Sequence, residues 1–584
     1  MKIHRHQRKS IFYYKRIWIY IAISLLTTSL QAQFITTWVT NDGQVTIPTN
    51  GGGYNYDLSW FNETNSGVGD GSVTGQTGNY TITGLENGSV YRVEITGGFP
   101  RIYFNNTGDK DKIQTVERWG SISWTSFARS FHGCTNLTIP AADTPDLTNV
   151  SSMLLAFSGC TSLNESLDSW DVSNVTNFFG TFQNCTSFNQ PLNSWDMTNA
   201  TDLTSMFQGA TNFNQTLSNW NITGISQIKV IFKDASSFNQ NIDHFDVSLV
   251  SDFAGTFEAA TSFNQPLNSW DMSSATDLGN MFFGATAFNQ PLDAWNVSSV
   301  VNMSFTLLDA SSFNQDLGSW DVQSATDMSD MLSNTALSKT NYSNTLIGWA
   351  ALPALQTGVT FRAIGLSYND AGQVARDALT NAPNSWNIQA GDTYVPATEV
   401  SGTISTNTIW TEVGSPYNLT GPVTVDNGVT LTIEPGVDVV FGNNNNDLTV
   451  NGTLIANGSP VDSIYFKNNL ASIYLSSSST GSIIDYARFD DLGVFNVAAL
   501  NVSGDASITH SKFSNCEVGV TIMNGATPTI QFCEMISSVD YGIRVDDGSP
   551  IIDNSSIDGG TGGIWIQAGT PSITNSTITN CGSQ

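Results

Sequence analysis

Tryptophan recurs along the middle of this chain at a fixed interval, and that interval limits the available folds more than any other feature. Six tryptophans lie on one 25-residue grid, with Phe245 in the only gap: Trp170, Trp195, Trp220, Trp270, Trp295 and Trp320. Weaker repeats centred on Trp119 and Pro145 precede them, which makes nine units. A fixed period of roughly 20 to 50 residues is typical of a solenoid, in which each repeat forms one coil.

The apolar positions within one unit indicate the kind of coil. Leu192, Trp195 and Met197 have the spacing L-x-x-W-x-M, which resembles the strand segment of leucine-rich repeats, where alternate side chains point inward. Leu203 and Phe207 lie four residues apart, a spacing that predicts one or two helical turns on the opposite side. Each unit is therefore predicted to contain a strand, a turn, a short helix and a second turn.

One asparagine per unit stands just before the predicted strand. Stacked amides at a solenoid turn can bond backbone groups of adjacent coils that would otherwise be buried without partners. We favour this structural role over ligand binding. The asparagine ladder consists of Asn164, Asn189, Asn214, Asn239, Asn264, Asn289 and Asn314.

An acidic strip is predicted on the exposed face of the same strands, between the two inward residues. Between Pro145 and Leu332 the only Lys or Arg residues are Lys229 and Lys233, so the acids have few internal partners. Calcium or a cationic ligand would relieve the repulsion between stacked carboxylates, but a hydrated, solubilising face is the favoured interpretation. The acidic strip consists of Asp171, Asp196, Asp246, Asp271 and Asp321, with Asn221 and Asn296 in the remaining coils.

The first 32 residues are typical of a secretory signal peptide. Six basic residues precede the apolar run from Ile17 to Leu30, and Ala32 is a suitable cleavage site. The run is about 14 residues long, short of the roughly 20 that a spanning helix needs. We therefore expect a secreted protein, extracellular or on the cell surface, without a transmembrane segment after signal removal. Its net charge of −29 argues against nucleic acid as a partner.

Three cysteines of the repeats occupy one register position. Cys134, Cys160 and Cys185 stand where later units carry alanine, as at Ala210. A position shared by Cys and Ala favours a small buried residue, although a disulfide between adjacent coils remains the alternative. The cysteines nearer the C-terminus lack the C-x-x-C spacing of zinc sites.

Residues 33–112 and 336–392 flank the repeats and differ from them. The first segment alternates apolar and polar residues, as in Tyr54-x-Tyr56-x-Leu58-x-Trp60, which predicts a small antiparallel β-sandwich. Turns such as Asn41-Asp42-Gly43 could hold calcium, but an ordinary turn role is favoured. The second segment predicts two amphipathic helices, the second capped by Asp370, and it would close the open end of the solenoid.

Several motifs resemble a known family. The repeated Phe-Asn-Gln…Trp-Asp-Val units, the run Phe99-Pro100-Arg101-Ile102-Tyr103-Phe104 and the closing Leu346-Ile347-Gly348-Trp349 are similar to those of the BspA-type leucine-rich repeat surface proteins of bacteria. The resemblance covers about residues 34 to 392. It implies an exported surface protein, some relatives being described as adhesins, and it brings no catalytic residues.

Residues 393–584 follow a shorter period. Ile508, Ile530, Ile552 and Ile573 are spaced 22, 22 and 21 residues apart, which predicts a right-handed parallel β-helix. The sequence ends within a coil, so we expect the natural product to continue beyond Gln584. The predicted fold is therefore mainly β, with a small N-terminal β-sandwich (33–112), a leucine-rich-repeat-like α/β solenoid (113–335), a helical closing cap (336–392) and the β-helix.

The β-helix raises the main rival to a binding function, because such folds often carry polysaccharide lyases or hydrolases. A hydrolase needs paired carboxylates, but a structural turn role is favoured for the five candidates: Asp540, Asp546, Asp547, Asp553 and Asp558. The basic residues that a lyase would need are widely separated: Lys467, Arg488, Lys512 and Arg544. His132, His244 and His510 also lie far apart, and nucleophile and metal motifs are absent.

Together these features predict adhesion to, or binding of, an extracellular protein or glycan. A carbohydrate-active enzyme on the β-helix and a passive surface spacer are the alternatives. We expect no catalytic residues and no cofactor, with calcium left open, and the sequence leaves the oligomeric state and the mode of anchoring undetermined.

Overall fold

The computed structural model describes residues 33–460, 462–467, 471–493, 497–558 and 562–579. The predicted signal peptide (1–32) and Cys581 lie outside these residues. The chain divides into two compact units: the first runs to Phe313 and includes Trp320–Asn334 and Val359–Phe361, and the second contains Asn314–Ser319, Thr335–Gly358 and everything from Arg362 onward. The predicted fold class is confirmed, since the chain is mainly β and only 5% helical.

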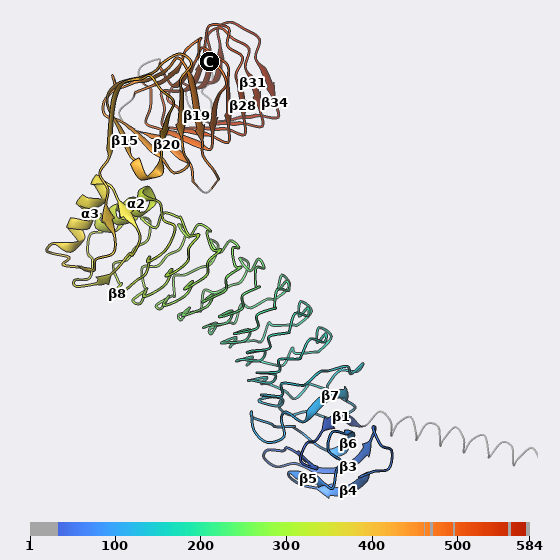
Figure 1. Cartoon of the computed structure of the whole chain (residues 1–584). Coiled ribbons are helices and arrows are strands. Elements are labelled where there is room, and N and C mark those ends of the chain that lie inside the picture. The colour runs from blue at the N-terminus through green and yellow to red at the C-terminus, as the bar shows by residue number, and fades with distance from the viewer. Residues whose placement is uncertain (1–32, 461, 468–470, 494–496, 559–561, 580–584) are drawn as a thin grey trace, which may run out of the picture. The chain divides into compact units, whose positions relative to one another are not determined.

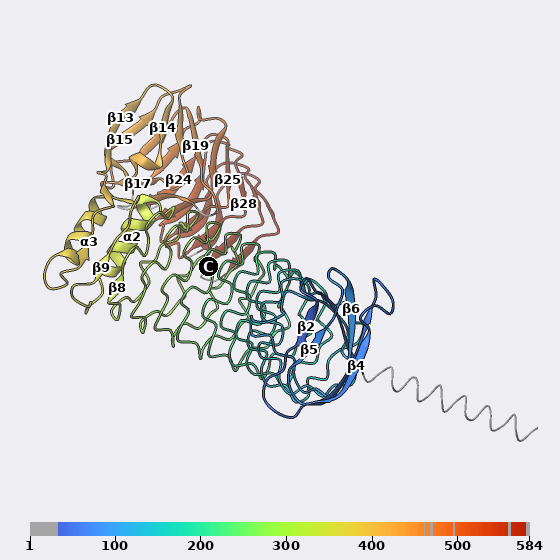
Figure 2. The same ribbon diagram turned by 60° about the horizontal axis from the view of Figure 1, so that its bottom comes forward.

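The first unit begins with two antiparallel sheets, labelled in Figures 1 and 2. One has five strands in the order β4-β3-β6-β1-β7, and the other pairs β2 with β5. As predicted, alternate residues of β3 are buried, among them Tyr56 and Leu58. The strands are β1 (Phe34–Val39), β2 (Gln44–Ile47), β3 (Asn55–Asn62), β4 (Gly71–Gln76), β5 (Tyr80–Thr83), β6 (Val90–Gly98) and β7 (Ile113–Arg118).

Successive 25-residue coils follow β7, but their strand lies elsewhere than predicted. No strand is assigned to the segment from Leu192 to Ala200. Coils are instead bridged in parallel one register position before the leucine of the next segment, as at Asn177, Asp202 and Gln227 and again at Asp252, Asp277, Asn302 and Asp327. The motif L-x-x-W-x-M buries its large side chains without a strand ladder, because turns interrupt it on both sides.

The predicted short helix is also wrong. In the segment Leu203–Gly209 alternate amides donate to the next coil, as Ser205 N does to Lys229 O at 3.0 Å, while Met206 N donates locally to Leu203 O at 3.0 Å. An α-helix would direct every amide four residues back along its own chain. Ser205 (φ 57°) and Gly209 (φ 69°) are moreover left-handed, which an α-helix does not accommodate.

The core of the coils is built from aromatic columns. Phe207 stacks on Phe182 and Phe232 of its neighbouring coils, each at 5.8 Å between ring centroids. Most tryptophans also donate an indole hydrogen bond to a carbonyl of the preceding coil, as Trp195 Nε1 does to Leu167 O at 2.9 Å. Each tryptophan of this kind therefore fills the core and satisfies one buried backbone acceptor.

The cysteine slot is a buried core position. Cys134, Cys160 and Cys185 are fully buried and unbridged. Burial raises the pKa of Cys185 to about 12, and its Sγ donates to Phe157 O at 3.0 Å. The alternative of a disulfide between adjacent coils is therefore not realised among these three residues.

Two helices, α2 (Lys339–Ala350) and α3 (Asp370–Thr380), lie in the segment that was predicted to cap the solenoid. Asn369, rather than Asp370, caps α3: its side chain accepts from Gly372 N at 3.0 Å, and Asp370 is the first helical residue. Trp349 of α2 is fully buried and donates from Nε1 to Leu317 O at 3.0 Å. The helix thus supplies the bond that a tryptophan supplies within the coils. The short strands here are β8 (Asp327–Met328), β9 (Thr360–Phe361), β10 (Ser367–Tyr368), β11 (Asn387–Ile388) and β12 (Thr393–Tyr394).

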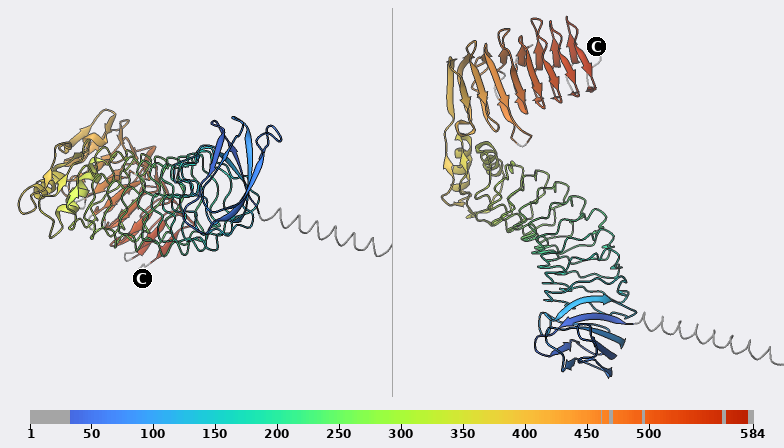
Figure 3. Two further views of the ribbon diagram at one scale, coloured as in Figure 1. Left: turned by 90° about the horizontal axis from the view of Figure 1, so that it is seen from below. Right: turned by 45° about the vertical axis from the view of Figure 1, so that its right-hand side comes forward.

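The second unit continues as a right-handed β-solenoid of about nine turns, whose flat parallel faces Figure 3 shows in orange and red. The predicted isoleucine column is confirmed, because Ile508, Ile530, Ile552 and Ile573 are register partners. None of the helices among the described residues is long and apolar enough to cross a membrane.

The β-solenoid has three faces. The long strand β15 pairs with β17 on one face and with β18 on another. A short helical turn, η1 (Glu412–Gly414), precedes β15. The strands are β13 (Thr398–Ile404), β14 (Thr408–Trp410), β15 (Tyr417–Val425), β16 (Thr430–Ile433), β17 (Asp438–Phe441), β18 (Leu448–Val450), β19 (Thr453–Asn457), β20 (Ile464–Lys467), β21 (Ile473–Leu475), β22 (Ser482–Asp485), β23 (Ala487–Asp490), β24 (Ala498–Val502), β25 (Ala506–Thr509), β26 (Lys512–Ser514), β27 (Val518–Ile522), β28 (Thr529–Gln531), β29 (Glu534–Ile536), β30 (Tyr541–Val545), β31 (Ile551–Asp553), β32 (Ser556–Asp558), β33 (Gly562–Ile566), β34 (Ser572–Thr574) and β35 (Thr577–Thr579).

Candidate functional site

The asparagine ladder forms hydrogen bonds between consecutive coils. Asn189 Oδ1 accepts from Asn214 N at 2.9 Å and from Gln215 Nε2 at 3.0 Å. Asn164, Asn214, Asn239 and Asn264 accept from the next coil in the same way. The glutamine of the Phe-Asn-Gln motif is part of the ladder, a role that sequence reasoning missed although the motif repeats. These amides are occupied by the backbone of the next coil.

The last ladder residue, Asn314, bonds the residues at the start of α2. Asn314 Oδ1 accepts from Ser338 N at 2.7 Å and from Asn341 Nδ2 at 2.9 Å. Ser338 is the N-cap of α2, and its own hydroxyl accepts from Asn341 N at 3.1 Å. The ladder residue therefore positions the start of the cap helix.

The acidic strip lies in turns rather than on strands. Asp196 Oδ1 accepts from Thr198 N at 3.0 Å and from Thr198 Oγ1 at 2.7 Å. The same Asx turn is made by the other four acids, Asp171, Asp246, Asp271 and Asp321, and by Asn221 and Asn296. The D-x-[S/T] pattern that four of these seven turns share was visible in the sequence. For four of the five acids the turn is exposed, Asp321 being half-buried.

Three of the strip carboxylates leave one oxygen for other partners. The hydrogen bonds of Asp171, Asp196 and Asp246 all reach Oδ1. Their Oδ2 atoms make no hydrogen bond with any residue that the structure describes. The two lysines of the region are engaged elsewhere, Lys229 with Asp252 at 2.8 Å and Lys233 with Glu258 at 2.7 Å. The strip is therefore an uncompensated row of negative charge.

These turns make stability depend on acid. The hydrogen bonds from Thr198 and Ser273 lower the pKa of Asp196 and Asp271 below the ordinary 3.8. A carboxyl whose pKa is lower in the folded state stabilises the fold above pH 3.8, and this contribution is lost as the pH falls through the folded-state pKa. We expect the midpoint temperature of thermal unfolding to decrease as the pH is lowered below 3.8. In the double variant Asp196→Asn, Asp271→Asn this decrease should be less steep. Equal slopes in melts at stepped pH would contradict this expectation.

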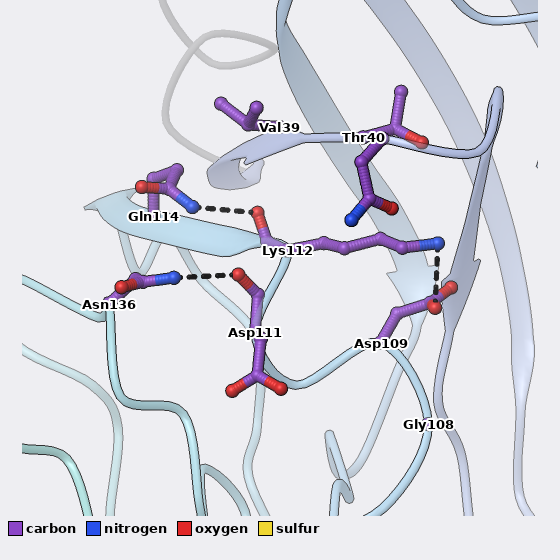
Figure 4. A pocket seen from close by; sticks show the side chains of 9 residues that line it. Val39, Thr40, Gly108, Asp109, Asp111, Lys112, Gln114 and Asn136 are labelled. Carbon is purple, nitrogen blue, oxygen red and sulfur yellow. Dashed lines mark hydrogen bonds and ion pairs between the residues drawn. The ribbon is translucent and has the colours of Figure 1, made fainter. Parts of the chain in front are cut away.

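A polar pocket of about 310 Å³ lies in the first unit, where β7 begins (Figure 4). Lys112 dominates it: its ammonium group contacts Asp42 Oδ1 at 2.7 Å and Asp109 Oδ1 at 2.8 Å. The hydrogen bond from Lys112 lowers the pKa of Asp42 to about 2. Gln114 and Asn136 donate to backbone carbonyls of the same loop. Lys112 thus already binds the carboxylate of Asp42, in the turn that was considered as a calcium site. Ion pairs and hydrogen bonds between its own residues hold this pocket together.

Several candidate acids and bases of the β-solenoid contact neighbouring side chains of the same solenoid. Asp553 accepts from Thr574 Oγ1 at 2.7 Å and from Asn575 Nδ2 at 2.9 Å, both in the next coil, and Arg544 pairs with Asp546 at 2.6 Å. The other bases lie apart from this pair: Lys467 contacts Asp438, Lys512 contacts Glu534, and Arg488 lies over the Tyr465 ring. In the described part of the chain, no three His, Cys, Asp or Glu side chains gather closely enough to hold a metal ion.

A second pocket, of about 360 Å³, lies in the second unit beside β17. It contains Asp438, which sequence reasoning missed. Asp438 stands at the start of the run Asp438–Phe441, otherwise an apolar strand. The side chain that binds it, Thr340, is 98 residues away in the sequence, so no local signal could have identified it.

These features define a tandem solenoid protein with an acidic repeat region and a β-helix. Residues 125–245 and 226–345 match a family model described as "Mycoplasma protein of unknown function, DUF285". Residues 439–584 match a model described as "Right handed beta helix region". No curated protein and no solved structure matches the chain. The two matched regions fit a surface protein.

Proposed function

We propose that this chain is a secreted bacterial surface protein of the BspA type, and that its acidic strip binds a macromolecular ligand in adhesion. The observation that carries the proposal is the row of five aspartates, four of them exposed, each held in place by its own Asx turn. Turns of this kind orient the carboxylates before any ligand arrives, which reduces the entropy lost on binding.

The charge of the strip favours a basic protein surface over an acidic glycan. The ligand that relieves repulsion along a row of carboxylates is cationic, and complementary charge raises both the rate and the specificity of association. Calcium bridging the strip to a second acidic surface is the alternative arrangement. A passive spacer would need neither a cationic ligand nor calcium.

Asparagine variants separate charge from structure. Because Asn221 and Asn296 make the same turn, replacing the five strip aspartates by asparagine should preserve the fold and remove only the charge. We expect residues 33–584 to bind an immobilised basic matrix protein saturably, and the fivefold variant to lose about tenfold or more in affinity.

Binding would be measured by surface plasmon resonance against matrix proteins and glycans, in calcium and in chelator. The control is Asp426→Asn with Asp447→Asn, two acids of the β-solenoid. Loss of binding in chelator would make calcium part of the site. No binding to any surface, or equal binding by the fivefold variant, would contradict the proposal and favour the spacer.

A further inference from the structure

The pocket beside β17 has a floor made of outward-facing residues of the first β-solenoid coils. Val439 and Phe441 of β17 are fully buried in the core, so the alternation of a strand turns Asp438 and Val440 outward. Val440 is the register partner of Asn418 on β15 and of Lys467 on β20. All four outward residues line the pocket.

The cap helices form the opposite wall. Asn344 and Ile347 of α2 line the pocket, together with the first turn of α3. The hydroxyl of Thr340 in α2 donates a hydrogen bond to Asp438 Oδ2 at 2.9 Å. This bond connects the helical wall of the pocket to β17 on its floor. Ile347 keeps 39% of its surface exposed, so the wall presents an apolar side chain beside polar ones.

Asp438 carries an unused acceptor at this pocket. Its side chain is only 2% exposed, and its Oδ2 accepts from Lys467 Nζ at 3.0 Å as well as from Thr340. Its Oδ1 is buried and has no hydrogen-bond partner among the described residues. A buried carboxylate oxygen without a donor is unfavourable, and buried polar groups are normally satisfied by protein, water or ligand.

We propose that this pocket binds a neutral, hydroxyl-rich ligand of monosaccharide size, with one hydroxyl donating to Asp438 Oδ1. The ammonium of Lys467 already neutralises the carboxylate, so a second cation would be placed beside it. An anion would face Asp438 and Asp370. A neutral hydroxyl avoids both repulsions.

The rest of the lining fits the same class of ligand. Asn418 uses Nδ2 to bind Glu399, which leaves its amide oxygen on the floor as an acceptor. Val440 and Ile347 offer apolar surface to the C–H groups of a sugar ring. The volume of about 360 Å³ lies within the range of about 300–1,000 Å³ that is usual for ligand sites. This site is independent of the acidic strip.

The test uses residues 33–584 and four probes: D-glucose, D-galactose, N-acetyl-D-glucosamine and, as a cation, ethylammonium. Saturation-transfer NMR and titration calorimetry would measure binding. We expect at least one sugar to bind saturably at millimolar concentration and ethylammonium to bind no more tightly. Absence of sugar binding, or binding of ethylammonium alone, would overturn the proposal.

Two variants locate the site. Asp438→Asn keeps the size of the side chain but puts an amide group in place of the free acceptor, and should weaken sugar binding by about tenfold or more. Ile347→Trp, at a partly exposed helical position, should fill the pocket and have the same effect. Asp447→Asn is the matched control outside the pocket. Circular dichroism would verify folding, and unchanged affinity in a folded Ile347→Trp variant would overturn the assignment.

Discussion

Phe207→Ala is expected to lower the free energy of unfolding of the coil region by about 3–5 kcal/mol. Phe207 is fully buried and stacks on Phe182, Phe232 and, at 4.1 Å, Phe213. Truncation removes the transfer energy of a phenyl ring and leaves a cavity in the middle of a continuous column. Each coil contacts only its neighbours in a solenoid, so the defect interrupts the column on both sides.

Phe207→Leu is the control for this effect. Leu307 and Leu332 occupy the same register position in later coils and are fully buried, so leucine fits the slot. We expect a loss smaller by about half, because most of the volume is retained. Denaturant titration followed by circular dichroism and tryptophan fluorescence would measure both losses. A loss below about 1.5 kcal/mol for the alanine variant would contradict the predicted importance of the column.

Trp349→Ala should have an effect of similar size, about 3–5 kcal/mol, at the cap. Trp349 is fully buried, and its Nε1 donates to Leu317 O at 3.0 Å. Removal opens a cavity beneath α2 and leaves that carbonyl buried without its indole donor. Because Trp349 packs on and bonds the segment at residues 314–319, we expect that segment to fray and unfold at lower denaturant concentration.

Trp349→Phe separates packing from hydrogen bonding. Phe245 already replaces tryptophan within the coils and is 5% exposed, so the ring change is tolerated in this type of core. The phenylalanine variant loses the indole donor and should be destabilised by about 1–2 kcal/mol. Hydrogen exchange at residues 314–319 would report the fraying directly. Equal protection in the wild type and the alanine variant would show that the cap does not close this end.

The two repeat periods predicted most of the fold, because a solenoid places residues of equal register on top of one another. Phe182 and Phe207, or Ile508 and Ile530, are one period apart and stack in the structure. The period says less about the local backbone. Leu203 and Phe207 have helical spacing, yet two left-handed residues per coil and bonds to the next coil form turns instead.

Of the two candidate sites, one could be predicted from the repeat period and the other could not. The acidic strip was predictable, since Asp196 and Asp271 differ by three periods. A threonine or serine two residues later predicts the Asx turn at both of these acids. The pocket at Asp438 was not predictable, because the residues that surround it come from α2, β15 and β20. No periodicity links these segments.

What the sequence determined by itself is everything that repeats: two solenoids, their inward columns, the asparagine ladder and the spacing of exposed charge. Repetition converts a one-dimensional pattern into a stack, since each coil can bury its apolar edge only against a copy of itself. Tertiary structure alone decided what interrupts the repeats. Asp438, for example, is buried with one oxygen unpaired, and its partner Thr340 comes from a segment that shares no register with it.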